Sequence, residues 1–179
     1  EGYRPLVLER GKKVGERTED VLHFWKTGVL DPTSNVQFGE GGAGTFSDGK
    51  LNTLVKDPVG RSRFVLDTFV SFGAPEKITY ESKPHIGTDI LSDVIAAMRE
   101  EILQLGGTFE FENCVTDIRV ADQKIKAVEI NHNAWMETEV CVLALGHSAR
   151  DTFEMLQKTG LFMEPKAFAV GFRVEHPQR

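Results

Sequence analysis

The chain has 179 residues, 40% of them apolar and 27% charged, which is an ordinary composition for a globular unit with one core. Its formal net charge is −6 and its lysines and arginines form no extended cluster, which argues against a nucleic-acid partner. The longest apolar run, residues 140–145, is too short to cross a membrane, and no basic and apolar leader opens the sequence. We therefore expect a cytoplasmic protein without a membrane partner.

The first predicted strand covers residues 4–9 and ends in an acid, Glu9. In a dinucleotide-binding unit such an acid stands about 20 residues beyond a G-x-G-x-x-G turn and binds a ribose hydroxyl. No such turn followed by a helix occurs in the sequence. Glu9 is therefore either a ribose-binding acid or a solvated carboxylate at a strand end, and the local sequence leaves both interpretations open.

A short helix is predicted over residues 17–26, with Val21, Leu22 and Trp25 on one face. After a loop comes a stretch rich in glycine, residues 39–50, which we call the glycine loop. Four of its glycines fall within six residues. Backbone with so few side chains can bring its amides close to an anion, so the glycine loop indicates a nucleotide-cofactor site.

The glycine loop also contains a competing pattern, because residues 44–50 satisfy the G-x-x-x-x-G-K of a P-loop. Leu51 stands where a P-loop needs a hydroxyl to reach magnesium, and residues 35–38 make a weak preceding strand. A P-loop-like binder of nucleotide phosphates stays an alternative. It predicts magnesium-dependent ATP or GTP binding that is lost in Lys50→Ala.

Residues 61–72 are predicted to form a second helix and residues 78–80 a short strand. The polar segment 83–89 then leads into the most regular helix of the chain, which ends at a pair of glycines. Thr88 is the expected N-cap of this helix, and Asp89 lies at the positive end of its dipole.

Four strand-like segments follow, at residues 108–112, 115–120, 125–130 and 135–145. The last one changes from an alternating to a wholly apolar pattern, which suits a strand that leaves an antiparallel meander and enters a buried parallel sheet. Ser148 and Asp151 resemble a capping box that opens a helix over residues 149–158. Residues 167–174 are the final predicted strand.

The cysteines and histidines indicate neither a disulfide nor a metal site. Cys114 and Cys141 lie in strand-like segments and form no C-x-x-C pair, so we expect both to be reduced. The five histidines lack the spacing of metal ligands, and we assign no metal.

Five segments together resemble the uncharacterised bacterial FAD-dependent dehydrogenases, which belong to the glutathione-reductase-like flavoproteins with two dinucleotide-binding domains; the segments are residues 6–11, 41–51, 83–89, 142–147 and 171–177. The resemblance implies an α/β fold with an FAD/NAD(P)-binding, Rossmann-like parallel sheet and an antiparallel β-meander, lacking its first βα unit. The expected regions are a dinucleotide-binding core at 1–60 and 108–160, a helical insertion on the substrate side at about 61–107, and the start of a further strand region at 161–179.

The resemblance also implies roles for individual residues. Glu9 would hold the adenosine ribose, Arg10 would lie on the adenine side, and Val115 would offer its backbone to adenine. Leu145, Gly146 and His147 would pass beneath the nucleotide, although the Leu-Gly-His turn departs from the commoner Ala-Thr-Gly. The glycine loop would bring amides to the pyrophosphate and flavin through Gly41, Gly42, Ala43 and Gly44, and would line the isoalloxazine with Thr45, Phe46, Ser47, Asp48, Gly49 and Lys50.

On the substrate side, His85 and Asp89 are the candidate catalytic groups, with a loop hydrogen-bond donor and a first-turn helix acid as the simpler interpretations. The implied partners are FAD, a small-molecule substrate and NAD(P)H or another electron carrier. The resemblance further implies an upstream glycine turn and a downstream flavin-contacting segment, both absent from the sequence. We therefore expect an internal portion of a larger flavoprotein that binds FAD weakly or not at all by itself.

Three functions follow from these observations as competing hypotheses. The first is a portion of an FAD-dependent oxidoreductase, and the second is the P-loop-like phosphate binder. The third is a non-catalytic module whose glycine loop contacts a partner protein, which predicts partner binding without nucleotide affinity. The sequence does not indicate the oligomeric state.

Overall fold

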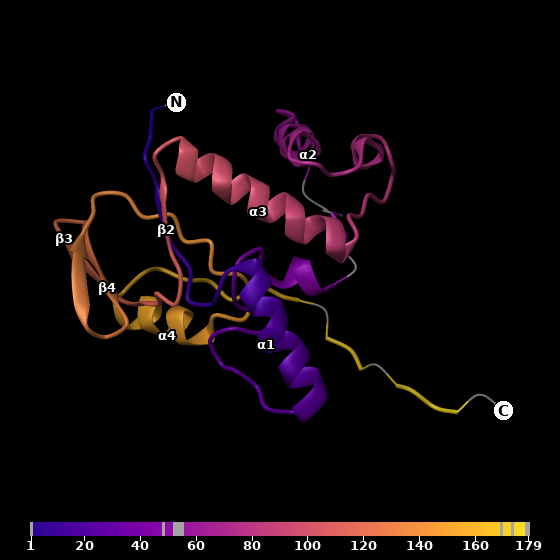
Figure 1. The fold of residues 1–179 in the computed structure, drawn as a ribbon. Coiled ribbons are helices and arrows are strands. Elements are labelled where there is room, and N and C mark those ends of the chain that lie inside the picture. Colours follow the sequence, from indigo (N-terminus) through magenta and orange to yellow (C-terminus); the bar gives the residue numbers. More distant parts are fainter. Residues whose placement is uncertain (1, 48, 52–55, 169, 173, 178–179) are drawn as a thin grey trace.

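The computed structural model describes residues 2–47, 49–51, 56–168, 170–172 and 174–177 and shows a mixed α/β unit with two small sheets (Figure 1). Strands β1 and β2 form a parallel pair, and β3, β4 and β5 form an antiparallel sheet in that order. The helices are α1 (Val14–Thr27), α2 (Arg61–Ser71), α3 (Thr88–Gln104) and α4 (Arg150–Lys158), together with the 3₁₀ helices η1 (Ala43–Phe46) and η2 (Glu76–Thr79).

The parallel pair joins β1 (Leu6–Leu8) to β2 (Thr108–Glu110), the strand that follows α3. Residue Leu8 lies opposite Glu110, so both strands end at the same edge. The pairing continues past the strands, because the amide of Asn113 donates to the carbonyl of Glu9 at 2.9 Å. The carboxyl ends of a parallel pair are where α/β proteins place their ligands, and this edge carries the sequence-predicted Glu9 and Arg10.

The antiparallel meander consists of β3 (Val115–Ala121), β4 (Lys124–Ile130) and β5 (Ala134–Glu137). The two residues between β3 and β4 both have positive φ, which matches the twist of a tight hairpin. Helix α4 packs on this sheet and completes a core of Ile118, Val128 and Leu156. The predicted meander is therefore confirmed.

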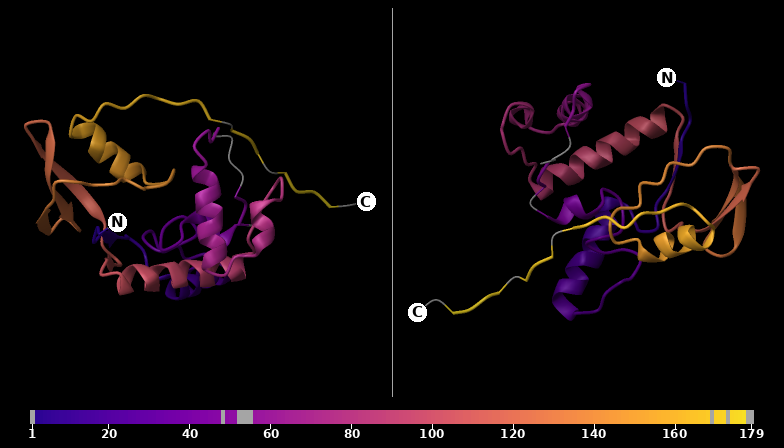
Figure 2. Two further views of the ribbon diagram at one scale, coloured as in Figure 1. Left: turned by 90° about the horizontal axis from the view of Figure 1, so that it is seen from above. Right: turned by 180° about the vertical axis from the view of Figure 1, so that it is seen from behind.

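A second core lies between α2, η2 and α3, on the other side of the unit (Figure 2). Its fully buried members are Ile78 of η2, Val94 of α3 and Ile86 in the segment before α3. The amphipathic pattern of α3 supplies most of one wall. Partly buried side chains from α2 and its C-cap, including Phe69 and Phe72, close the other wall.

Three local predictions were wrong. Residues 78–80 are not a strand, because Pro75 opens the turn of η2, in which the amide of Ile78 donates to the Pro75 carbonyl at 3.2 Å. The N-cap of α3 is Gly87 rather than Thr88, and that of α4 is Ala149 rather than Ser148; neither cap makes a side-chain hydrogen bond.

The apolar run at residues 140–145 was predicted to be a buried strand, and this prediction was also wrong. Strand β5 ends at Glu137, and no strand of the described chain lies beside the run. Val142 is 85% exposed. An apolar pattern can predict burial, but it cannot supply a partner strand. The described residues between 167 and 174 likewise form no strand and extend away from the two cores (Figure 2); Ala169 and Arg173 lie outside the described residues.

The buried face of α1 also differs from the predicted one. Val21 is buried, but Leu22 and Trp25 are exposed. The buried positions are instead Val14, Arg17 and Val21, at helical spacing. The helix thus turns an arginine inward, and the glycine loop packs around it.

Candidate functional site at the carboxyl edge of the parallel strands

Glu9 ties the end of β1 to the glycine loop. One oxygen of its carboxylate, Oε1, accepts hydrogen bonds from the amide of Gly11 at 2.8 Å and from the amide of Gly39 at 3.1 Å. An added Cβ on Gly11 would lie 2.6 Å from the Cα of Gly39, so the two backbones touch. The Glu9 side chain is half-buried and joins two segments through Oε1, so it is more than a freely solvated strand-end carboxylate, and its role toward a ribose stays a prediction.

Arg10 connects the same edge to the start of α4. Its Nη2 donates to Oδ1 of Asp151 at 3.0 Å and to the hydroxyl of Thr152 at 3.2 Å. The guanidinium lies 4.4 Å from the ring centroid of Phe38, a cation–π distance. Burial lowers the pKa of Arg10, but the hydrogen bond with Asp151 and the charge of that carboxylate oppose this, and the pKa lies above its ordinary value.

A cavity of about 670 Å³ opens between β3 and α4, next to the residues that Arg10 contacts. Val115, which the resemblance assigns to adenine, is among its lining residues, as are Asp151 and Thr152. Burial raises the pKa of Cys114 in this wall against the opposing charge of Arg10. The thiol therefore stays protonated at neutral pH, and we assign it no nucleophilic role.

The glycine loop is built around the guanidinium of Arg17, which is fully buried. Nε donates to the carbonyl of Asn35 at 2.8 Å, Nη1 to those of Glu40 at 2.7 Å and Gly42 at 2.9 Å, and Nη2 to that of Val36 at 3.0 Å. Burial lowers the pKa of Arg17 to about 10, although the charges of Glu9 and Glu40 oppose this. The side chain remains a cation at neutral pH.

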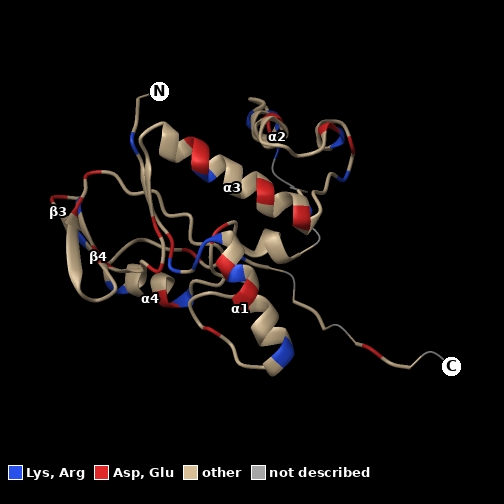
Figure 3. Cartoon of the chain, viewed as in Figure 1, with Lys and Arg blue, Asp and Glu red and all other residues tan. Residues whose placement is uncertain are grey.

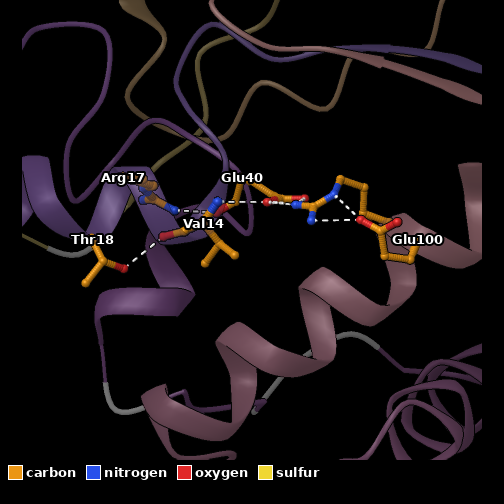
Figure 4. Close-up of polar contacts among 6 residues, drawn as sticks. Val14, Arg17, Thr18, Glu40 and Glu100 are labelled. Atoms are coloured by element: carbon orange, nitrogen blue, oxygen red, sulfur yellow. Dashed lines mark hydrogen bonds and ion pairs between the residues drawn. The ribbon is translucent and has the colours of Figure 1, made fainter.

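Glu40, inside the glycine loop, links it to two helices (Figure 4). Its Oε2 accepts from the amide of Val14 at the start of α1, at 2.8 Å, and pairs with Nη1 of Arg99 on α3, at 2.6 Å. Arg99 also pairs with Glu100 at 3.0 Å. Figure 3 shows acidic and basic residues mixed along α1, and mainly acidic residues along α3. Local sequence patterns do not reveal the roles of Arg17, Glu40 and Arg99. The one pattern that could have indicated a buried Arg17 is its helical spacing with Val14 and Val21.

The end of the glycine loop pairs with the segment before α3, so two of the five segments that carry the resemblance, 41–51 and 83–89, lie side by side. Lys50 and His85 form an antiparallel bridge, in which the amide of Ile86 donates to the Gly49 carbonyl at 3.0 Å. His85 and Asp89 are both exposed. In the described part of the chain no hydrogen bond joins these two candidate catalytic residues. Asp48 lies outside the described residues.

Replacing Gly49 with alanine should destabilise the contact between these two segments. Gly49 has a φ of +61°, and an added Cβ would overlap the backbone carbonyl of Ile86. We expect Gly49→Ala to lower the free energy of unfolding by about 2–4 kcal/mol in urea titrations. Gly60→Ala is the matched control, because Gly60 is left-handed with open space around it and should cost only about 1 kcal/mol. Equal losses in the two variants would contradict the proposed overlap.

Asp151 should make a stabilising contribution that depends on pH. Burial raises its pKa, but hydrogen bonds from Arg10 and the Thr152 amide outweigh this and hold the pKa below its ordinary value. A lowered folded-state pKa stabilises above about pH 4, and the contribution disappears as the pH falls through the folded-state value.

The free energy of unfolding should therefore differ between the native chain and Asp151→Asn at pH 7, by less than about 1 kcal/mol because the carboxylate is largely exposed; thermal unfolding measures it. The difference should shrink as the pH falls from 7 to about 2, through the lowered folded-state pKa. Asp93→Asn on the exposed face of α3 is the control. A difference between native and Asp151→Asn that is the same at both pH values would exclude the Arg10–Asp151 contact as its source.

The remaining predicted residues are distributed more widely. Leu145 packs against the core beneath α4. Gly146 has a φ of +70°, and the exposed His147 ring lies 6.1 Å from that of Phe168. Thr45 in η1 is buried, and its hydroxyl makes no hydrogen bond with the described residues. Within the described chain no hydrogen bond or ion pair links His147 to Glu9 or to the glycine loop.

The P-loop pattern does not have the surroundings that its chemistry requires. Residues 35–38 are a bend rather than a strand, and the pattern itself contains η1. A P-loop connects a buried strand directly to the N-terminus of a helix. Among the described residues the segment lacks both neighbours, which weighs against the phosphate-binding alternative in its P-loop form.

Comparison with known proteins gives a relative but no functional description. No protein-family model matches the chain. A protein of Clostridium beijerinckii, described as an uncharacterized protein, is 52% identical over 177 residues, which are 99% of this chain and 33% of that protein. The chain thus spans about a third of the length of this relative. In the described part of the chain no helix is long and apolar enough to cross a bilayer, and no three His, Cys, Asp or Glu side chains are grouped to hold a metal.

Proposed function

We propose that this chain is the part of an FAD-dependent oxidoreductase that holds the adenosine and pyrophosphate of FAD on a Rossmann-like, dinucleotide-binding fold. The observation that carries the proposal is the convergence at one edge of the parallel pair. Glu9, Arg10 and the glycine loop all meet there, although they are separated in sequence. The length of the C. beijerinckii relative is compatible with a protein that supplies the rest of a larger fold.

The residues present at this edge fit such a cofactor. The second carboxylate oxygen of Glu9, Oε2, accepts no hydrogen bond from the described residues and is available to a ribose hydroxyl. The amides of Gly41, Ala43 and Gly44 also meet no acceptor within the described chain. Free amides in a glycine-rich turn with positive φ form a cradle for phosphate oxygens. The cavity beside Val115 would take the adenine ring.

When bound, the flavin would supply the redox chemistry, and the protein would supply position and electrostatics. Glu9 would fix the ribose, the glycine loop would hold the pyrophosphate, and Arg10 would keep the cavity wall of α4 in place. His85 and Asp89 on the α3 side would be the polar groups nearest a small-molecule substrate. An electron carrier such as NAD(P)H remains a prediction of the resemblance, and a cytoplasmic location remains a prediction of the composition.

Competition binding tests the proposal on the full-length gene product that contains this chain. FAD should bind, and ADP should compete with it because both would use the adenosine and pyrophosphate sites. FMN should compete far less, since it lacks the adenosine end. Competition by FMN but not by ADP would contradict the assignment of this chain to the adenosine end.

A second candidate function is the non-catalytic interaction module, which the exposed apolar side chains favour. Phe172 is 97% exposed and Val142 is 85% exposed. Val140 and Val170, two positions away from them, are 78% and 79% exposed, and neighbouring exposed apolar side chains of this kind mark interaction surfaces. This candidate predicts that the full-length protein binds a partner protein and has no affinity for FAD or ADP in the same titrations.

A further inference from the structure

We infer that Arg17 is the positioning residue that turns the amides of the glycine loop outward, toward an anion. The inference rests on the proposed function only for the identity of that anion, the pyrophosphate of FAD. The hydrogen bonds by which Arg17 orients the glycine loop do not depend on which anion binds. Arg17 contacts the segments before, within and after the loop's glycines, through hydrogen bonds to Asn35, Val36, Glu40 and Gly42 and through the ring of Phe46 at 4.7 Å.

The planarity of the peptide bond connects each carbonyl to one amide. In a trans peptide the C=O and the following N–H point in opposite directions, and the described chain has no cis peptide. The carbonyl of Glu40 shares its peptide unit with the amide of Gly41, and the carbonyl of Gly42 shares its unit with the amide of Ala43. Because Arg17 draws both carbonyls inward, it turns both amides away from the core.

These are two of the amides that meet no acceptor in the described chain. The amide of Gly42, in contrast, donates to the Gly39 carbonyl at 3.0 Å, and that of Thr45 donates to the Gly42 carbonyl at 3.3 Å. The loop therefore contains amides that close its turns and amides that meet no acceptor in the described chain. Arg17 holds two peptide units of the second kind, those that carry the amides of Gly41 and Ala43.

Glycine is required where the backbone approaches the arginine or folds on itself. An added Cβ on Gly39 would overlap the Arg17 side chain, and one on Gly41 would overlap the hydroxyl of Thr45. Both positions have positive φ. The four closely spaced glycines are thus explained in part by the buried guanidinium beneath them. The Glu40–Arg99 ion pair anchors the same turn to α3, at 2.6 Å.

Amide exchange in the native chain tests the geometry without any variant. In ¹H–¹⁵N NMR spectra, the amides of Gly41 and Ala43 should exchange with solvent at least tenfold faster than those of Gly42 and Thr45. Inorganic pyrophosphate is the probe, and it should shift the Gly41 and Ala43 resonances saturably. Equal exchange rates for the four amides, or no pyrophosphate shift at Gly41 and Ala43, would overturn the inference.

The variant Arg17→Lys then separates positioning from general stability. Lysine keeps a buried cation but cannot bond both pairs of carbonyls, so pyrophosphate affinity should fall at least tenfold while the dispersed spectrum of a folded protein remains. Arg61→Lys, on an exposed helix surface, should leave the affinity unchanged. Unchanged affinity in Arg17→Lys would overturn the positioning role.

The outcome for the proposed function is distinct. A full-length protein that binds no FAD, with a pyrophosphate response that still depends on Arg17, would refute the flavoprotein assignment and support the inference. A full-length protein that binds FAD equally well with arginine or lysine at position 17 would support the flavoprotein assignment and refute the positioning role of Arg17.

Discussion

Arg17→Met is expected to be the most destabilising single substitution at the site, lowering the free energy of unfolding by about 4 kcal/mol. Methionine fills a similar volume but donates no hydrogen bond. Four backbone carbonyls would then be left without the donor that they share, two of them from residues that are themselves buried. The charge of Glu9 and Glu40 would also lose its nearest buried cation. Urea unfolding followed by circular dichroism measures the loss.

The matched control for this experiment is Arg61→Met. Arg61 begins α2 with an exposed side chain, so its replacement should change the free energy of unfolding by no more than about 0.5 kcal/mol. Similar unfolding midpoints for Arg17→Met and Arg61→Met would show that the carbonyls around Arg17 find water or other donors at little cost. The glycine loop would then not be a shell that the Arg17 guanidinium holds together.

Glu9→Gln should separate ligand binding from stability in the full-length gene product. Glutamine keeps the side-chain oxygen that accepts from the amides of Gly11 and Gly39. It replaces the second oxygen with an amide group and removes the negative charge. We expect FAD affinity to fall by about 10- to 100-fold, the loss of a charged hydrogen bond, while the unfolding midpoint stays nearly constant.

Glu9→Ala provides the comparison, because it removes both functions of the carboxylate. This variant should lose affinity and also stability, since the amides of Gly11 and Gly39 lose their shared acceptor. Isothermal titration with FAD and urea unfolding on the same samples give both quantities. If Glu9→Gln bound FAD as tightly as the native protein, the ribose-binding role of Glu9 would be refuted.

The parts of the fold that the sequence predicted well are those set by local pattern. The apolar face of α3 repeats at helical spacing over 17 residues, and the meander has alternating strands joined by turn residues. Failures occurred where an element depends on a neighbour. Residues 140–145 are apolar enough for a buried strand but have no partner strand in the described chain, and Ile78 is buried through a 3₁₀ turn.

In the candidate site, too, the sequence predicted the features set by local pattern and not those that depend on distant residues. Composition alone identified the glycine loop, and position after a strand identified Glu9. Neither could reveal that a helix arginine would occupy the centre of the loop, because Arg17 reaches carbonyls 18 to 25 residues away. The Glu40–Arg99 pair spans 59 residues and is equally invisible to local pattern. The assignment of His85 and Asp89 stays a prediction, since the structure places them on one segment without a shared hydrogen bond.

An ultraviolet–visible spectrum of the purified full-length gene product, recorded beside this chain with and without added FAD, decides whether the protein is a flavoprotein. We expect a flavin spectrum in the full-length protein, and weak or no FAD binding by the 179 residues alone. No flavin spectrum in the full-length protein, even after reconstitution with FAD, would contradict the flavoprotein assignment and would favour the interaction module instead.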